Sequence, residues 1–105
     1  MAYERLVRKI THENLWLYIL SLLKKEPLYG YEIRRKIEGR FGFKPGQVTA
    51  YIVLYRLERE GYIYVIRREK GSRGPSRKYY GITEKGREVL EKARTFLISV
   101  VSELG

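Results

Sequence analysis

The sequence predicts a mainly α fold with one small β-hairpin (α+β), built as a single domain over residues 1–105. Three observations lead to this prediction. Helical apolar periodicity recurs in three successive stretches, two β-rich segments then flank a turn rich in Gly, Ser and Pro, and a last amphipathic stretch closes the chain. No internal repeat or long linker divides the sequence, whose 105 residues suit one domain.

The first helix is predicted over residues 11–26, THENLWLYILSLLKKE. Thr11 is expected to cap its start, and Pro27 to stop it. This helix is apolar on nearly all sides, so we expect more than one surface to cover it, one of which a second subunit could supply. The expected dimer contacts on this helix are Leu15, Trp16, Ile19, Leu20 and Leu23.

A second, short helix is predicted over residues 31–40, because apolar side chains recur every four residues at Ile33, Ile37 and Phe41. Gly42 fits the position just past its end. The sequence that follows, Phe-Lys-Pro-Gly, is typical of a turn and separates this helix from the next one.

A third helix is predicted over residues 47–60. At about 100° per residue, Ala50, Leu54 and Leu57 share one face and should lie in the core. The opposite face is less polar than a face in contact with water should be. We therefore expect a partner to contact it.

Residues 62–68 and 77–82 are β-rich and predict a hairpin. Tyr80 and Ile82 alternate onto one strand face and should be core residues, while Tyr79 should point outward. From Arg67 to Lys78 there are six basic residues and a single acidic one. A basic hairpin of this kind can contact phosphates.

The last helix follows Thr83, which is expected to cap its start. Its apolar side chains recur at steps of three and four residues, which is close to coiled-coil spacing and predicts that the helix pairs with another surface. The residues expected at this interface are Leu90, Ala93, Phe96, Leu97, Val100, Val101 and Leu104.

Three short helices followed by a β-hairpin are the parts of a winged helix-turn-helix, here over residues 11–82, with a C-terminal dimerisation helix over residues 83–105. In this arrangement the third helix enters the major groove of DNA and the hairpin, or wing, lies along the backbone. The expected DNA contacts are Lys44, Gln47, Val48, Thr49, Tyr51 and Arg56 near the third helix, and Arg68, Lys70, Arg73, Arg77 and Lys78 in the wing.

Some of these assignments have alternatives. The Tyr51 hydroxyl could contact a phosphate, or its ring could simply pack. The Gln47 side chain could form a bidentate hydrogen bond with adenine, or it could bond to backbone groups at the end of its helix. Val48 and Ile52 could touch thymine methyl groups or pack against a neighbouring element. Trp16 could be interface core or a platform for a ligand.

Charge and composition narrow the function classes. A net charge of +10 points to a polyanionic partner, nucleic acid first and an anionic membrane surface second. The chain has no cysteine and one histidine, so we expect no disulfide, no thiolate nucleophile, no metal site and no cofactor. No phosphate-binding glycine loop occurs, and an enzyme is not expected. The N-terminus lacks a signal-peptide pattern and the apolar runs are too short to span a membrane, so we expect a cytoplasmic protein.

Three stretches match a known pattern: LYGYEI over residues 28–33, VTAY through LYRLE to Gly61 over residues 48–61, and GPSRKYYGITEKGR over residues 74–87. In these stretches the chain resembles the PadR-like transcriptional regulators. The family pattern in the third helix is Gly-Thr-Leu-Tyr-Pro. Here Thr49 and Tyr51 match, whereas Val48 and Ile52 stand where the family has Gly and Pro.

The resemblance implies a homodimeric repressor that binds a pseudo-palindromic double-stranded operator. It also implies that the C-terminal helix packs against the N-terminal helix of the partner. Some family members bind flat aromatic compounds between the subunits, where a tryptophan of the C-terminal helix sandwiches the ligand; here that helix offers only Phe96. Two alternatives therefore remain: a sensor of small aromatic compounds with Trp16 and Phe96 at the dimer interface, and a basic protein that binds nucleic acid by charge alone.

Overall fold

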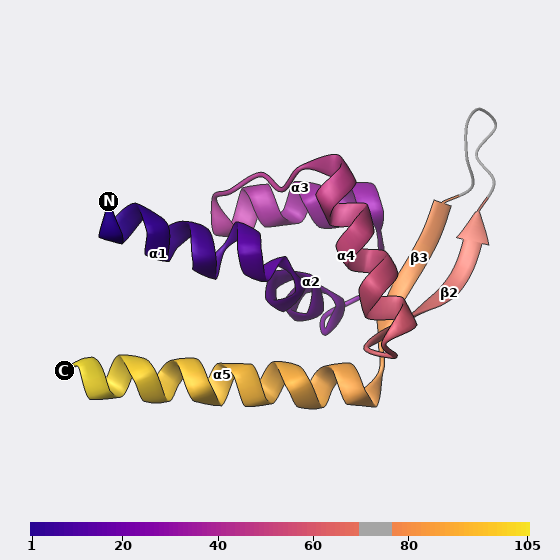
Figure 1. The fold of residues 1–105 in the computed structure, drawn as a ribbon. Helices are drawn as coiled ribbons and strands as arrows, with labels where there is room; N and C mark the ends of the chain where they lie inside the picture. Colours follow the sequence, from indigo (N-terminus) through magenta and orange to yellow (C-terminus); the bar gives the residue numbers. More distant parts are fainter. Residues whose placement is uncertain (70–76) are drawn as a thin grey trace.

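The computed structural model describes residues 1–69 and 77–105. The described chain is mainly helical with a small antiparallel sheet, as the sequence predicts (Figure 1). The elements in order are α1 (Ala2–Ile10), the short 3-10 helix η1 (His12–Asn14), α2 (Leu15–Leu23), β1 (Leu28–Tyr29), α3 (Gly30–Phe41), α4 (Gln47–Arg59), β2 (Ile63–Glu69), β3 (Arg77–Ile82) and α5 (Glu84–Leu104).

The N-terminal region differs from the prediction of one helix over residues 11–26. Thr11 precedes η1, but its side chain does not cap that helix: its hydroxyl donates a hydrogen bond to the Val7 carbonyl oxygen at 2.6 Å, and so closes the end of α1. Asn14 reinforces this end through a bond from its amide nitrogen to the Lys9 carbonyl oxygen. A new helix, α2, then begins at Leu15.

Helix α1 was not predicted, because its frequent charges obscure a short apolar stripe. Tyr3, Leu6, Val7 and Ile10 recur at the i, i+3, i+4, i+7 spacing of one helical face. All residues of α1 are exposed in the single chain. Figure 1 shows the helix projecting from the molecule.

The core explains why α2 is apolar on nearly all sides. α2 packs against α3, α4, α5 and β3 of its own chain. The side chains of Leu15, Ile19, Leu20 and Leu23 are therefore buried in the single chain, and so is Leu90 of α5. These five residues were expected at a dimer interface; they form the chain's own core and present almost no surface to a partner.

The sheet has the strand order β1-β3-β2, with both pairings antiparallel. β1 was not predicted, because two residues are too short to show a β pattern and their pairing partner lies about fifty residues away. Leu28 pairs with Tyr80 and Tyr29 pairs with Tyr79. This strand ties the start of α3 to the hairpin.

The hairpin lies over residues 63–69 and 77–82, close to the prediction. Tyr80 and Ile82 are buried, as expected. Tyr79 was expected to point outward; instead it is half-buried, with its ring centroid 5.4 Å from that of Tyr29. The extra strand β1 supplies the surface that covers it.

The last helix begins as predicted, since the Thr83 hydroxyl oxygen accepts a hydrogen bond from the Gly86 backbone nitrogen at 3.0 Å. Gly86 has a packing role here. A Cβ atom at this position would overlap the Tyr62 carbonyl oxygen. Beyond its first turns α5 runs out from the molecule on the same side as α1 (Figure 1). None of the described helices is long and apolar enough to cross a membrane.

Candidate nucleic-acid interface

Helix α4 presents an apolar face that no other part of the described chain covers. Its inner face is buried through Ala50, Leu54 and Leu57, as predicted. On its outer face Val48 is 72% exposed, Tyr55 60% and Ile52 48%. These side chains, with Gln47 and Tyr51, line an open groove of about 400 Å³.

The turn before α4 is fixed by side chains from α3, α2 and η1. Arg34 of α3 donates two hydrogen bonds, from Nε and Nη2, to the Pro45 carbonyl oxygen at 3.3 Å each. Phe43 packs edge-on against Tyr18 and His12, with ring centroids 5.0 and 4.9 Å apart. The N-terminal end of α4 is therefore held in a defined position relative to α2 and α3. Arg34 was not among the predicted site residues.

Tyr51 connects α4 to the first turn of α3. Its ring lies over Gly30, where an added Cβ atom would come within 2.8 Å of Tyr51 Cε1. The packing alternative for the Tyr51 ring is thus observed. The residue as a whole is 45% exposed.

The half of the hairpin farther from Ile63 and Ile82 carries a row of stacked arginine and tyrosine side chains, which we call the arginine–tyrosine array. The Arg67 guanidinium carbon lies 4.0 Å from the centroid of the Tyr79 ring, and that of Arg77 lies 4.9 Å from the Tyr29 ring. The Tyr29 and Tyr79 rings contact one another. Each stacked cation contributes about 0.5–1 kcal/mol at an exposed site.

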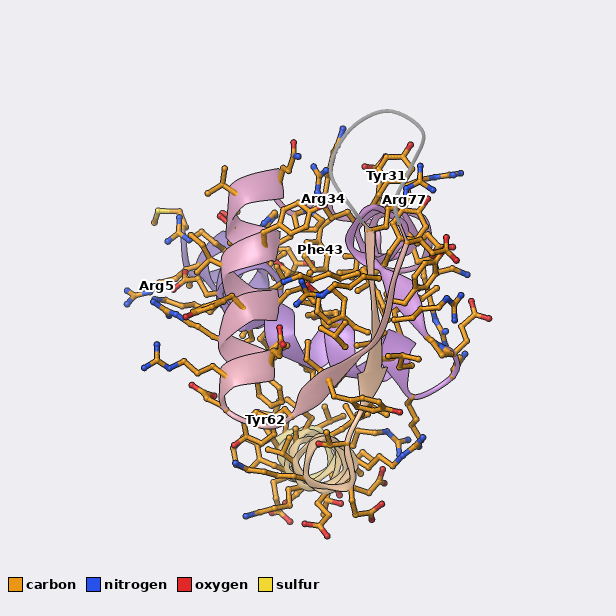
Figure 2. All side chains as sticks on the ribbon, turned by 90° about the vertical axis from the view of Figure 1, so that its right-hand side faces the viewer. Arg5, Tyr31, Arg34, Phe43, Tyr62 and Arg77 are labelled. Atoms are coloured by element: carbon orange, nitrogen blue, oxygen red, sulfur yellow. The ribbon has the colours of Figure 1, made fainter. Side chains whose placement is uncertain are left out.

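The array continues onto α3. The Tyr29 and Tyr31 rings are stacked at 6.3 Å, and the Arg35 guanidinium lies 5.8 Å from the Tyr31 ring. Figure 2 shows the labelled Tyr31 and Arg77 close together at the upper end of the molecule, beside the hairpin. The array thus joins β2, β3, β1 and α3 in one cationic surface.

The sequence predicted Arg77 as a DNA contact and placed Arg67 among the basic residues of the hairpin, but it did not predict Arg35 as part of this surface or the stacking of Arg67. One signal was available. Arg67 and Tyr79 lie on adjacent strands, so their stacking could be read from the hairpin once its register was known. That register includes an irregularity between Val65 and Arg67, which the sequence pattern does not reveal.

The remaining predicted DNA contacts are placed as follows. Lys44, Gln47, Thr49 and Arg68 are exposed, and Lys78 is half-buried. Lys70 and Arg73 lie outside the described residues. Most of the predicted residues that the structure describes are thus accessible to a ligand.

Arg56 is exposed, but it also borders a second cavity, of about 360 Å³. This cavity lies between α2, α4 and α5, and Trp16, Val53, Tyr62 and Val89 contribute to its walls. Trp16 is half-buried, and its indole nitrogen donates to the Asn14 side-chain oxygen at 3.2 Å. In the single chain, Trp16 therefore lines a cavity and Phe96 does not.

The rest of the predicted dimer residues lie at or near the surface. Trp16, Ala93 and Leu97 are half-buried, and the others on α5 are exposed. Together with the stripe of α1 they form what we call the terminal apolar surface. Its members are Tyr3, Leu6, Val7 and Ile10 of α1, and Phe96, Val100, Val101 and Leu104 of α5.

Glu32 accepts a hydrogen bond from the backbone nitrogen of Tyr29, a member of the arginine–tyrosine array, at 3.2 Å. Glu13, between α1 and α2, accepts a hydrogen bond from Lys9 that, with the charges of Lys9 and Arg8, lowers the pKa of its carboxyl group. Glu69, at the end of β2, lies 3.3 Å from Arg67. Among the residues described, no group of His, Asp and Glu is arranged to hold a metal ion.

Solved structures show the same fold. A PadR family transcriptional regulator from Eggerthella lenta is 28% identical, with a TM-score of 0.77 over 100% of this chain and 94% of that chain. A PadR-like transcriptional regulator from Bacillus cereus is 34% identical, with a TM-score of 0.70 over 86% of each chain. Bacillus subtilis PadR, solved in complex with operator DNA, is 29% identical, with a TM-score of 0.67 over 74% of this chain and 45% of that chain.

The sequence itself matches the model of the transcriptional regulator PadR-like family over residues 19–92. The match covers α3, α4, the hairpin and the first half of α5, and thus all the elements that form the candidate interface. Members of this family are transcriptional regulators and not enzymes. The chain belongs to the PadR-like family of transcriptional regulators, with its winged helix-turn-helix fold.

Proposed function

We propose that this protein is a homodimeric repressor that binds a pseudo-palindromic operator in double-stranded DNA. In this proposal α4 enters the major groove, and the β2–β3 hairpin lies on the neighbouring backbone. The observation that carries it is the exposed apolar face of α4 in a strongly basic chain whose hairpin carries the arginine–tyrosine array.

Charge supports a DNA ligand. The chain carries a net charge of +10, and the array places Arg67, Arg77 and Arg35 on one surface. Cations there would neutralise phosphates and position the protein without reading sequence. The Bacillus subtilis PadR structure, which was solved in complex with operator DNA, matches 74% of this chain. This similarity also supports DNA as the ligand.

The terminal apolar surface supports a dimer. The eight large apolar side chains of this surface, on α1 and the second half of α5, are exposed in the single chain, and both helices project to the same side (Figure 1). A cluster of exposed apolar side chains such as this one is typical of a protein–protein contact. A twofold dimer would present two α4 helices to half-sites about one DNA turn apart.

The test compares one duplex from the upstream region of the protein's own gene with a scrambled duplex of equal length, at the same salt concentration. We expect binding at least about a thousandfold tighter to the operator. Equal affinity for both duplexes, with the same salt dependence, would identify a protein that binds by charge alone.

A second candidate function, compatible with the first, is sensing of small aromatic compounds. The cavity of about 360 Å³ that Trp16 lines supports it, because α4 and α5 both contribute walls and a ligand there would contact both. Trp16 is the only tryptophan, so its fluorescence reports on the cavity directly. Quenching by planar cationic or phenolic compounds is expected. An unchanged signal across a broad panel of them would argue against a sensor.

A further inference from the structure

We propose that Val48 and Ile52 read the 5-methyl groups of thymine, so that each operator half-site carries thymines where these two side chains reach the major groove. The inference rests on the proposed DNA-binding function and adds the base chemistry that α4 recognises. It concerns sequence choice, whereas the arginine–tyrosine array concerns affinity for any duplex.

The geometry places both side chains on one exposed strip of α4. Val48 is 72% exposed and Ile52 48% exposed, and they lie four residues apart, or about 6 Å along the helix axis. Both line the open groove of about 400 Å³ on the outer face of α4. A few consecutive base pairs would span both side chains.

Chemistry limits what these side chains can recognise. Valine and isoleucine offer methyl and methylene groups and no hydrogen-bonding atom. The apolar group that a base pair displays in the major groove is the thymine 5-methyl group, and the other base edges there present donors and acceptors. Two exposed aliphatic side chains on a helix in the groove would therefore gain most from thymine.

The surroundings of the strip favour DNA over a second copy of this chain. Lys44, which is exposed, precedes the helix, and the chain as a whole is strongly basic. A second copy also carries a net charge of +10 and would be repelled there. The terminal apolar surface, which suits a second copy, lies on α1 and α5 at the side of the two termini, away from the hairpin (Figure 1).

The experiment uses deoxyuridine, which pairs as thymine does but lacks the 5-methyl group. A duplex obtained by selection from random DNA is made in versions with one thymine at a time replaced by deoxyuridine. Replacing a contacted thymine should weaken binding of the full-length protein about fourfold for each methyl group lost. Replacement outside the half-sites should change nothing.

Variants then assign each methyl group to a side chain. In Val48→Ala one thymine position should lose its sensitivity to deoxyuridine, and in Ile52→Ala another should. Val53→Ala is the matched comparison, because Val53 lies on the same helix but is half-buried and faces the cavity with Trp16. It should keep the methyl sensitivity of the original protein at both positions.

The outcomes separate this inference from the function on which it rests. If the protein binds its selected duplex specifically but no deoxyuridine replacement weakens binding, thymine-methyl readout is wrong and the DNA-binding proposal stands. If the protein binds all duplexes equally, both are wrong. Because the deoxyuridine series uses the unchanged protein, the result does not depend on the variants folding.

Discussion

At the scale of single residues, the two helical glycines Gly39 and Gly86 lie in very different surroundings. Both lie inside helices, where glycine usually costs about 0.5–1 kcal/mol relative to alanine. Gly86 lies against the Tyr62 carbonyl oxygen and has no room for a side chain, whereas a Cβ atom at Gly39 would meet nothing within 4 Å. Because Gly86 has no side chain, the start of α5 can pack closely against the backbone of Tyr62, the residue before β2.

Gly86→Ala should therefore lower the free energy of unfolding by about 1–3 kcal/mol, because backbone must move to admit the methyl group. Gly39→Ala should raise it by about 0.5–1 kcal/mol. Urea unfolding of both variants checks the pair. Similar changes of the same sign in the two variants would contradict the packing described at the start of α5.

Tyr80 gives a prediction for alkaline pH. Burial raises the pKa of its phenol, and the charge of Glu58 adds to the effect. Because the folded-state pKa lies above the unfolded one, the unfolded state loses the proton first. The free energy of unfolding should then fall as pH rises through about 10. Tyr80→Phe should show a shallower fall over the same range in thermal unfolding. An identical slope would show that Tyr80 does not contribute.

At the scale of elements, the sequence predicts those helices and strands that are long and have a clear apolar periodicity. The third helix and the hairpin strands lie within about one residue of the predicted bounds, because each has a clear pattern and a turn at its ends. α1 was missed because the apolar residues of its stripe are spread among charges, and none of its residues belongs to the buried core of the single chain. β1 was missed because its two residues are defined only by pairing with β3.

The residues of the candidate site also divide into those that the sequence predicts and those that it does not. The exposed face of α4 follows from helical periodicity alone, so Val48 and Ile52 could be placed in advance. The arginine–tyrosine array could not, because it depends on pairing between β1, β2 and β3 and on an irregular register. The wrongly assigned dimer residues of α2 show the same limit. Periodicity reports that a side chain is buried, not whether its own chain or a partner buries it.

Arg77, which lies on β3 against the Tyr29 ring, gives a prediction for DNA affinity. Arg77→Ala should weaken binding to every duplex and reduce the slope of log affinity against log salt by about 1, since one phosphate contact is lost. Arg94→Ala is the comparison: Arg94 is equally charged, but it is paired with Glu91 on α5. Its slope should match that of the unchanged protein. An unchanged slope in Arg77→Ala would mean that this arginine is solvated and contacts no DNA.

At the scale of the whole molecule, the two exposed apolar surfaces are proposed to bind different partners. The strip on α4 faces the proposed DNA ligand, and the terminal apolar surface faces the proposed partner subunit. The buried core lies between them and involves neither. Changes at the terminal surface should therefore alter assembly without unfolding the single chain.

Val101→Glu tests this separation, because Val101 is 68% exposed and a charge there would be buried in a dimer. The variant should be monomeric by sedimentation, keep its helical circular dichroism and bind the operator much more weakly. Lys92→Glu makes a larger change of charge at an exposed position of α5 outside the apolar seam, and it should remain a dimer. Sedimentation of the unchanged protein as a monomer at micromolar concentration would contradict the dimer.

The central claim, that this protein is a sequence-specific dimer on double-stranded DNA, is tested most directly by selection from a pool of random duplexes. Selected sequences should converge on a pseudo-palindrome with two half-sites about one DNA turn apart, each containing thymines. A selected pool that shows no enriched motif after repeated rounds, while still binding the protein at low salt, would contradict the claim.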